Sequence, residues 1–281
     1  MKLASVITTA PRRVSYLDET LSSLSRAGFD TPIIIDDEDK TFGPYGNFRR
    51  ALRIALREFP KAEVIAVFQD DILVVDRLRA WIDANCWPVL LDQTGIVSLY
   101  CAGKHELNRS GFHRLPLKRG DSRESDQSMA SVILNDLQDR GRCFPDSIWR
   151  DVESVEIVRV FDDCTIAIAS VRGVDKWLWA FEWEHKGQPR IDISEMTPWS
   201  LAYGACAYLI PRVNADRFIC EEDGAKTKTD INVARICSWF GLDYWMYSPS
   251  LVQHVGEVSS LDDRPLTPYR RSERFRQEAV A

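Results

Sequence analysis

The sequence lacks the features that mark several common classes of protein. No apolar run approaches the roughly 20 residues of a membrane-spanning helix, and the first dozen residues contain no long apolar segment of a secretory signal. No Cys-x-x-Cys pair occurs, and the seven cysteines, an odd number, lie mostly among apolar neighbours. We therefore expect a cytoplasmic protein with no membrane span and with buried, reduced thiols, not a disulfide framework or a zinc site.

Nucleic-acid binding through general phosphate neutralisation is also disfavoured, because the chain carries a formal charge of −6. Basic residues nevertheless cluster between residues 104 and 123. The chain has 281 residues, 45% of them apolar, and can bury a full core. Since no repeat, low-complexity tract or clear linker interrupts it, we expect a single domain over residues 1–281.

The N-terminal third alternates strand and helix patterns. An apolar strand is predicted at residues 3–9, and a helix with an apolar stripe follows until Gly28. Residues 31–39 form an apolar strand that ends in acids, and a second helix follows the glycine-containing loop at 42–47. A third strand ends at Gln69-Asp70-Asp71. This order, with short connections, predicts an α/β fold with a parallel sheet covered by helices.

Acidic residues follow two of these predicted strands. The carboxyl ends of parallel strands form one edge of a sheet, where ligands bind. Four carboxylates are expected to converge at this edge: Asp36, Asp37, Asp70 and Asp71. They would repel one another without a cation, and their hard oxygens suit Mg²⁺ or Mn²⁺, which in turn bind diphosphate oxygens. Taken alone, the Asp70-Asp71 pair is also typical of a turn or a helix cap.

The middle of the chain is polar from residue 104 to about residue 150, and we predict a helix at 125–139. Residues 154–184 have the pattern of strands. Within them, four aromatic residues alternate with other residues and would share one face of a strand: Trp177, Trp179, Phe181 and Trp183. Two interpretations stay open for this face, namely packing within the sheet and a platform on which a sugar stacks.

The C-terminal third offers three further features. Residues 201–211 form a strand of small residues that permits close approach of a ligand or another backbone. The acidic loop Cys220-Glu-Glu-Asp-Gly224 precedes a helix that Thr229 or Asp230 would cap. His254 lies beside glycine and hydroxyl residues, where it is either structural or a ligand.

Six segments along the chain carry a family resemblance: Val6-Ile-Thr-Thr-Ala-Pro-Arg12, Ile35-Asp-Asp37, Phe68-Gln-Asp-Asp71, Tyr203-Gly-Ala-Cys-Ala-Tyr-Leu-Ile-Pro-Arg212, Pro249-Ser-Leu-Val-Gln-His-Val-Gly256 and Ser259-Ser-Leu261. In order and spacing they resemble nucleotide-sugar-dependent glycosyltransferases of the GT-A fold. The last two segments look like the branch that includes N-acetylglucosaminyltransferases. Gln69-Asp70-Asp71 departs from the family's usual Asp-x-Asp, so Asp71 is the better candidate for a metal ligand.

The resemblance implies a GT-A type, Rossmann-like mixed sheet, mainly parallel and flanked by helices, with a β-rich insertion in the middle. Residues 1–103 would then bind the nucleotide sugar and residues 104–281 would form the acceptor side. It also implies residues near the donor nucleotide and its phosphates: Thr9, Pro11, Arg13, Asp37, Asn47, Asp70, Asp71 and Ser259. Arg50 could meet a phosphate or belong to a solvated arginine face.

Sugar transfer from a nucleoside diphosphate, here expected to be UDP, needs charge neutralisation on the departing diphosphate and proton removal from the acceptor hydroxyl. Mn²⁺ or Mg²⁺ held by Asp71 and His254 would perform the first task. A carboxylate would perform the second in an inverting displacement. The resemblance makes Asp230 the first candidate for this base, with Glu222 and Asp223 in reserve, although Asp230 could also be a plain helix cap.

Three alternatives stay open. Nucleotidyltransfer onto a sugar phosphate would use the same sheet and acids, but it normally begins with a glycine-rich phosphate loop, and none follows residue 9. A catalytically silent glycan- or protein-binding module would use the acids as caps. The expected acceptor is a glycan, a protein or a small molecule, and modified bases of DNA are the alternative. The DNA contact surface would be a basic stretch that could also be a mobile loop: Lys104, His105, Arg109, His113, Arg114, Lys118 and Arg119.

Overall fold

The computed structural model divides the chain into two compact units, residues 1–112 together with 203–281, and residues 113–202. The sequence predicted one domain whose halves meet after residue 103. The first unit instead combines both ends of the chain, because strands from both ends pair within one sheet. The structure describes residues 1–86, 90, 92–101, 110–115, 127–143, 151–160, 164–172, 177–184, 190–191, 195–196, 204–219, 228–257, 271–272 and 274–277.

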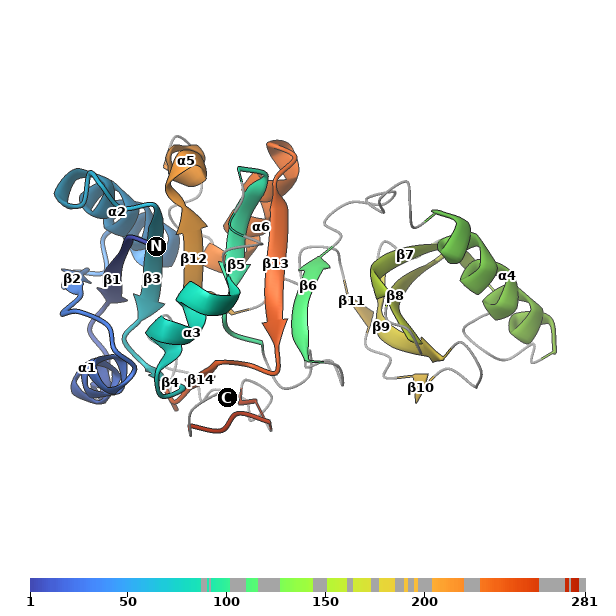
Figure 1. Cartoon of the computed structure of the whole chain (residues 1–281), viewed down its shortest axis with the longest axis horizontal. Coiled ribbons are helices and arrows are strands. Elements are labelled where there is room, and N and C mark those ends of the chain that lie inside the picture. Colours follow the sequence, from blue (N-terminus) through green and yellow to red (C-terminus); the bar gives the residue numbers. More distant parts are fainter. Residues whose placement is uncertain are drawn as a thin grey trace. The chain divides into compact units, whose positions relative to one another are not determined.

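The described residues form a seven-stranded sheet (Figure 1), and its strands are β1 (Leu3–Thr9), β2 (Ile33–Asp36), β3 (Val64–Gln69), β5 (Thr94–Ser98), β6 (Gly111–Leu115), β12 (Ala207–Pro211) and β13 (Asp243–Ser248). Their order is β2-β1-β3-β12-β5-β13-β6. β1 is parallel to β2 and β3, and β13 is parallel to β5, whereas β12 is antiparallel to both of its neighbours. The fold is therefore mixed α/β with a mostly parallel sheet, which is compatible with a Rossmann-like architecture.

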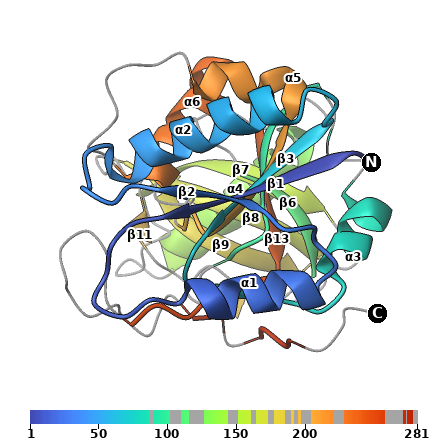
Figure 2. The same cartoon turned by 90° about the vertical axis from the view of Figure 1, so that its left-hand side faces the viewer.

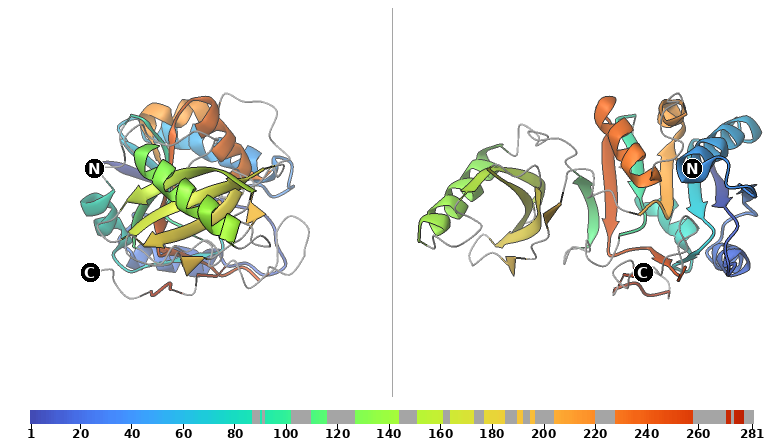
Figure 3. Two further views of the ribbon diagram at one scale, coloured as in Figure 1. Left: turned by 90° about the vertical axis from the view of Figure 1, so that its right-hand side faces the viewer. Right: turned by 180° about the vertical axis from the view of Figure 1, so that it is seen from behind.

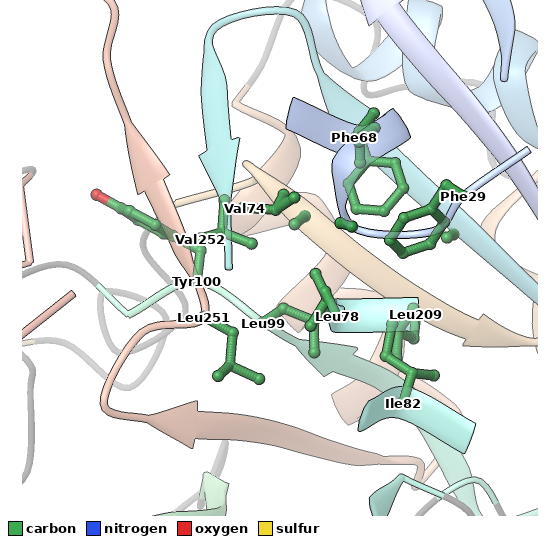
Figure 4. Packing of buried hydrophobic residues seen from close by; sticks show 14 of the residues in the cluster. Phe29, Phe68, Val74, Leu78, Ile82, Leu99, Tyr100, Leu209, Leu251 and Val252 are labelled. Carbon is green, nitrogen blue, oxygen red and sulfur yellow. The ribbon is translucent and has the colours of Figure 1, made fainter. Parts of the chain in front are cut away.

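Helices cover this sheet, and their bounds are α1 (Leu17–Arg26), α2 (Gly43–Glu58), α3 (Leu78–Asn85), α5 (Arg212–Ala215), the 3-10 helix η6 (Asp216–Phe218) and α6 (Thr229–Trp239). Figure 2 shows α2, α5 and α6 on one side of the strands and α1 on the other. On the α1 side, Phe68 of β3 belongs to one buried cluster with Leu24 of α1. Figure 4 shows Phe68 and Leu78 within this cluster. On the α2 side, α2 contacts β3, and its Phe48 ring meets Tyr208 of the neighbouring strand β12 edge to face. Both faces of β3 are thus covered, which explains its uninterrupted apolar run.

The described part of the second unit contains a helix packed against a small antiparallel sheet (Figure 3, left). Ile133 and Leu137 of the helix share a buried cluster with Val155 and Ala167 of the strands. The predicted helix at 125–139 and the strands at 154–184 are confirmed, but the side chains of the four alternating aromatic residues lie outside the described part. The elements are α4 (Gln127–Cys143), β7 (Val152–Val160), β8 (Cys164–Val171), β9 (Trp177–Glu184), β10 (Arg190–Ile191) and β11 (Glu195–Met196).

The described residues bear on the predictions about membrane-spanning helices and about the cysteines. No helix in this part of the chain is both long enough and apolar enough to cross a membrane. Four cysteines are buried and free, as predicted: Cys86, Cys101, Cys206 and Cys237. Burial raises the pKa of the Cys86 thiol to about 12, so this thiol stays protonated and unreactive at neutral pH.

Candidate functional site

Asp70 and Asp71 form the turn between β3 and a short strand, β4 (Ile72–Val74). β4 pairs with β14 (Val252–His254), and the register places His254 opposite Ile72. As a result, His254 Nε2 lies 3.1 Å from Asp71 Oδ2. The Val255 N–H extends the pairing by donating to the Asp71 carbonyl oxygen at 2.9 Å. Residues far apart in the chain, Asp71 and His254, are thereby held side by side by backbone pairing.

Thr20 of α1 supports this turn from the other side of β4. Its buried hydroxyl lies 3.0 Å from the Asp70 carbonyl oxygen and 2.9 Å from the Ile72 carbonyl oxygen. It also accepts a hydrogen bond from the Ile72 N–H at 3.1 Å. The hydroxyl therefore bonds backbone groups on the edge of β4 that faces away from β14, where no other described strand pairs with β4, and it holds the acidic turn in place.

Arg12 bridges the two aspartates. Its Nη1 lies 2.5 Å from Asp71 Oδ2, and its Nη2 lies 2.5 Å from Asp70 Oδ1. The side chains of Arg12, Asp70 and Asp71 are 10%, 3% and 5% exposed, so this ion-pair cluster is nearly buried. Thr9 completes it by donating its hydroxyl to Asp70 Oδ2 at 2.6 Å. The cation that the sequence required beside the acids is, in this structure, the Arg12 guanidinium.

The two carboxyl groups are shifted in opposite directions. Burial raises the pKa of Asp70 to about 6, although Arg12 opposes the rise and the neighbouring Asp71 adds to it. Burial alone would also raise the pKa of Asp71, but the hydrogen bonds and charge of His254 and Arg12 outweigh it and lower that pKa below its ordinary range. Asp71 is therefore the carboxylate that stays ionised as the pH falls.

Asp70→Asn is expected to gain stability relative to the wild type by about 2 kcal/mol as the pH rises from about 4 to about 7. The folded protein keeps the Asp70 proton up to about pH 6, whereas an unfolded aspartate loses it near pH 3.9. The wild type therefore loses stability from this group as the pH rises through that window, and asparagine does not titrate. Urea unfolding at both pH values measures the difference. A difference that is independent of pH would show that Arg12 fully offsets the burial of Asp70.

The end of β1 is tied to α2 by polar side chains. Asp37 caps the start of α2, because its carboxylate accepts the Phe42 N–H at 3.2 Å and the Gly43 N–H at 3.0 Å. Asn47 donates to the Thr9 carbonyl oxygen at 3.0 Å and to the Ile35 carbonyl oxygen at 3.1 Å. Both side chains are buried and bonded within the protein, so their described contacts are structural.

The four predicted carboxylates lie at the ends of β2 and β3, the strands on either side of β1, but among them only Asp70 and Asp71 share a cationic partner in the described contacts. Asp70 and Asp71 share Arg12, whereas Asp37 caps a helix and Asp36 is exposed. The four acids follow two different strands, but the residue after β2 turns back onto the start of α2. Arg50 donates to the Asp36 carbonyl oxygen at 3.0 Å and lies over the Phe42 ring at 4.2 Å. Its contact with a phosphate stays a prediction.

The remaining predicted site residues are divided between exposed, buried and undescribed positions. Pro11 and Arg13 are exposed in the segment after β1, on either side of the partly buried Arg12. Glu222, Asp223 and Ser259 lie outside the described residues. Within the predicted DNA-contact stretch, His113 is fully buried and Arg114 is 9% exposed, so these two residues do not form a basic surface. The other five residues of that stretch lie outside the described part.

Asp230 lies in the first turn of α6 but does not cap the helix, whose N-cap residue is Lys228. Its Oδ2 accepts the Gly204 N–H at 3.2 Å, and its Oδ1 accepts the Ile231 N–H at 2.9 Å. Burial raises the pKa of Asp230, and these backbone hydrogen bonds and the charge of Lys228 oppose the rise. A buried carboxyl group whose pKa is raised is a candidate for proton transfer.

Asp71 and His254 offer the ligand types that Mn²⁺ accepts, a carboxylate oxygen and an imidazole nitrogen. Asp71 Oδ1 is buried and has no hydrogen-bond partner among the described residues, so it is open to a cation. A Cβ at Gly256 would lie 2.5 Å from Asp71 Oδ2, which shows how closely the chain passes the carboxylate. No group of three or more metal-binding side chains occurs in the part of the chain that is described. A cation held here would complete its coordination with water or ligand oxygens.

A scan against protein-family models and a search of curated proteins found no match to this chain. The description of this protein therefore rests on its mixed α/β fold and on the acidic site at the end of β3. The sequence correctly selected Asp70, Asp71 and His254 as neighbours, but it selected Arg13 where the structure places Arg12 against the acids. Pro11 indicates that the chain turns after β1, but no local sequence pattern shows which of the two arginines contacts the aspartates.

Proposed function

We propose that this protein is a GT-A type glycosyltransferase that moves a sugar from a nucleoside diphosphate sugar, with UDP as the nucleotide, to an acceptor hydroxyl. The observation that carries the proposal is the juxtaposition of Asp71 and His254 beside Asp70 at the end of a central strand. Carboxylate and imidazole ligands at the carboxyl edge of a mostly parallel sheet suit a divalent cation and a bound diphosphate.

The geometry also supports separate roles for the residues of the site. Asp71 and His254 would hold Mn²⁺ or Mg²⁺, which supplies neutralising charge for the departing diphosphate when bound. Thr9 and Asp70, joined by a 2.6 Å hydrogen bond, lie at the ends of β1 and β3, where the donor sugar or ribose would bind. Asp230 is the candidate for the general base of an inverting displacement, because it is buried and its pKa is raised.

Titration calorimetry of UDP into the protein tests the proposal. We expect binding in the presence of Mn²⁺, and binding at least about tenfold weaker with chelator or in Asp71→Asn, because the charged ligand is lost. Asp30→Asn is the matched control, since Asp30 is exposed and distant in sequence from the site. Binding of UDP that is equal in all three proteins, or absent in all conditions, would contradict the proposed function.

A further inference from the structure

We propose that Arg12 competes with a divalent cation for the carboxylates of Asp70 and Asp71, so that the cation binds only after the guanidinium has moved away. The assignment of these carboxylates to a divalent cation rests on the proposed function. The competition itself rests on the geometry of Arg12, and it makes Arg12 the residue that sets the affinity of the site for metal.

The first observation is that the guanidinium uses the oxygens a cation would need. Arg12 reaches Asp71 Oδ2 and Asp70 Oδ1 at 2.5 Å each, and Asp71 Oδ2 also lies 3.1 Å from His254 Nε2. A metal ion binds carboxylate oxygens at about 2.1 Å and would lie close to the guanidinium, where two positive charges in a nearly buried site repel strongly. The two cations are therefore mutually exclusive at these oxygens.

The second observation is that the ion-pair cluster leaves hydrogen-bonding groups unused. Asp71 Oδ1 is a buried acceptor with no partner among the described residues, and Arg12 Nε is a buried donor in the same condition. Leaving buried polar atoms unpaired is unfavourable. A second bound state would satisfy both groups: a cation would bind the Asp71 carboxylate through Oδ1 together with the Oδ2 that Arg12 now occupies, and an anion would accept hydrogen bonds from the released guanidinium.

The third observation concerns which partner can move. Asp70 and Asp71 are anchored by β3, by β14 and by the buried hydroxyl of Thr20. Arg12 instead belongs to the irregular segment 10–16, in which its neighbours Pro11 and Arg13 are exposed. Release of the guanidinium therefore requires movement of a long side chain and a surface segment, while the carboxylates stay in place.

This exchange predicts that metal and diphosphate bind cooperatively. A diphosphate would provide a new anionic partner for the displaced guanidinium, because arginine N–H groups bind phosphate oxygens well. Metal alone offers no such partner. The wild-type protein should therefore bind Mn²⁺ weakly by itself.

Binding of Mn²⁺ alone, followed by the EPR signal of the free ion, tests the competition without nucleotide or sugar. Arg12→Gln removes the charge and is expected to bind Mn²⁺ about tenfold or more tightly than the wild type, since the carboxylates are then free. Arg12→Lys keeps the charge but loses the two-pronged contact, and its affinity should lie between the two. Arg26→Gln is the matched control, because it removes an exposed arginine charge from α1 and should leave Mn²⁺ affinity unchanged.

Equal Mn²⁺ affinity of Arg12→Gln and wild type, or no Mn²⁺ binding by either, would overturn the proposal. If Arg12→Gln does not fold, as thermal unfolding would show, Arg12→Lys decides, and an affinity equal to that of the wild type overturns the proposal. These results are independent of UDP. Tighter Mn²⁺ binding by the variants together with no UDP binding would support the competition and contradict the proposed function.

Discussion

Replacing Gly204 by alanine is expected to lower the free energy of unfolding by about 3 kcal/mol. Gly204 has a φ of +106°, and a Cβ there would lie 2.1 Å from Cε1 of the Tyr100 ring. That ring is 2% exposed, so it has little room to withdraw. The substitution would also disturb the hydrogen bond from the Gly204 N–H to Asp230, which lies at the candidate base. Urea unfolding followed by circular dichroism measures the loss.

Gly241→Ala is the matched control for this prediction. Gly241 also has a positive φ, +63°, but a Cβ there would have no atom within 4 Å. Its substitution should cost only the backbone strain, about 1 kcal/mol. Equal losses for the two variants would show that the contact with Tyr100 relaxes freely and that only backbone conformation matters.

Thr20→Val is expected to destabilise the protein by about 2 to 3 kcal/mol with almost no change in side-chain volume. The hydroxyl of Thr20 is fully buried, accepts the Ile72 N–H, and lies within donating distance of two carbonyl oxygens that share its single proton. Valine would leave these backbone groups buried and unpaired. Because the same hydroxyl holds the acidic turn, we also expect Thr20→Val to weaken UDP binding with Mn²⁺.

Ser22→Ala is the control for Thr20→Val, since Ser22 lies on the same helix but is exposed. It should change the free energy of unfolding by less than about 0.5 kcal/mol. Thermal unfolding of both variants and of the wild type measures these changes in the free energy of unfolding. A loss in Thr20→Val no larger than that in Ser22→Ala would mean that water or a neighbouring group replaces the hydroxyl.

The elements of the first unit could be predicted well because their signals are local. β1 and β3 follow from apolar periodicity and from the acids after β3, and the structure has them close to the expected ranges. The predicted loop at 42–47 is wrong, because α2 already begins at Gly43 with a proline in its first turn, a position that proline favours. The grouping into units could not be predicted, because it depends on which strands pair. β12 inserts between β3 and β5, although the chain separates it from both by a long stretch. No local pattern encodes that partner choice.

Some residues of the candidate site could likewise be predicted from local sequence patterns, and others could not. Asp70, Asp71 and His254 could be selected because acids that follow an apolar strand, and a histidine among glycine and serine residues, are unusual in composition and position. The hydrogen bonds of Asp37 to the start of α2 could not be predicted, since they depend on how the loop folds back. Thr20 was not selected, because a threonine within a helix has no local mark of a tertiary hydrogen bond.

The amino-acid order alone therefore determined the α/β class, most element positions and the pair of acids at the end of β3. These features depend on neighbouring residues, because they follow from apolar periodicity and from the residue types that end helices and strands. The folded chain decided which groups face those acids. Arg12 and Arg13 are adjacent and chemically identical, yet only the direction of the chain after β1 brings Arg12 against both carboxylates. Electrostatic partnership depends on distances of a few ångströms, and tertiary packing sets those distances.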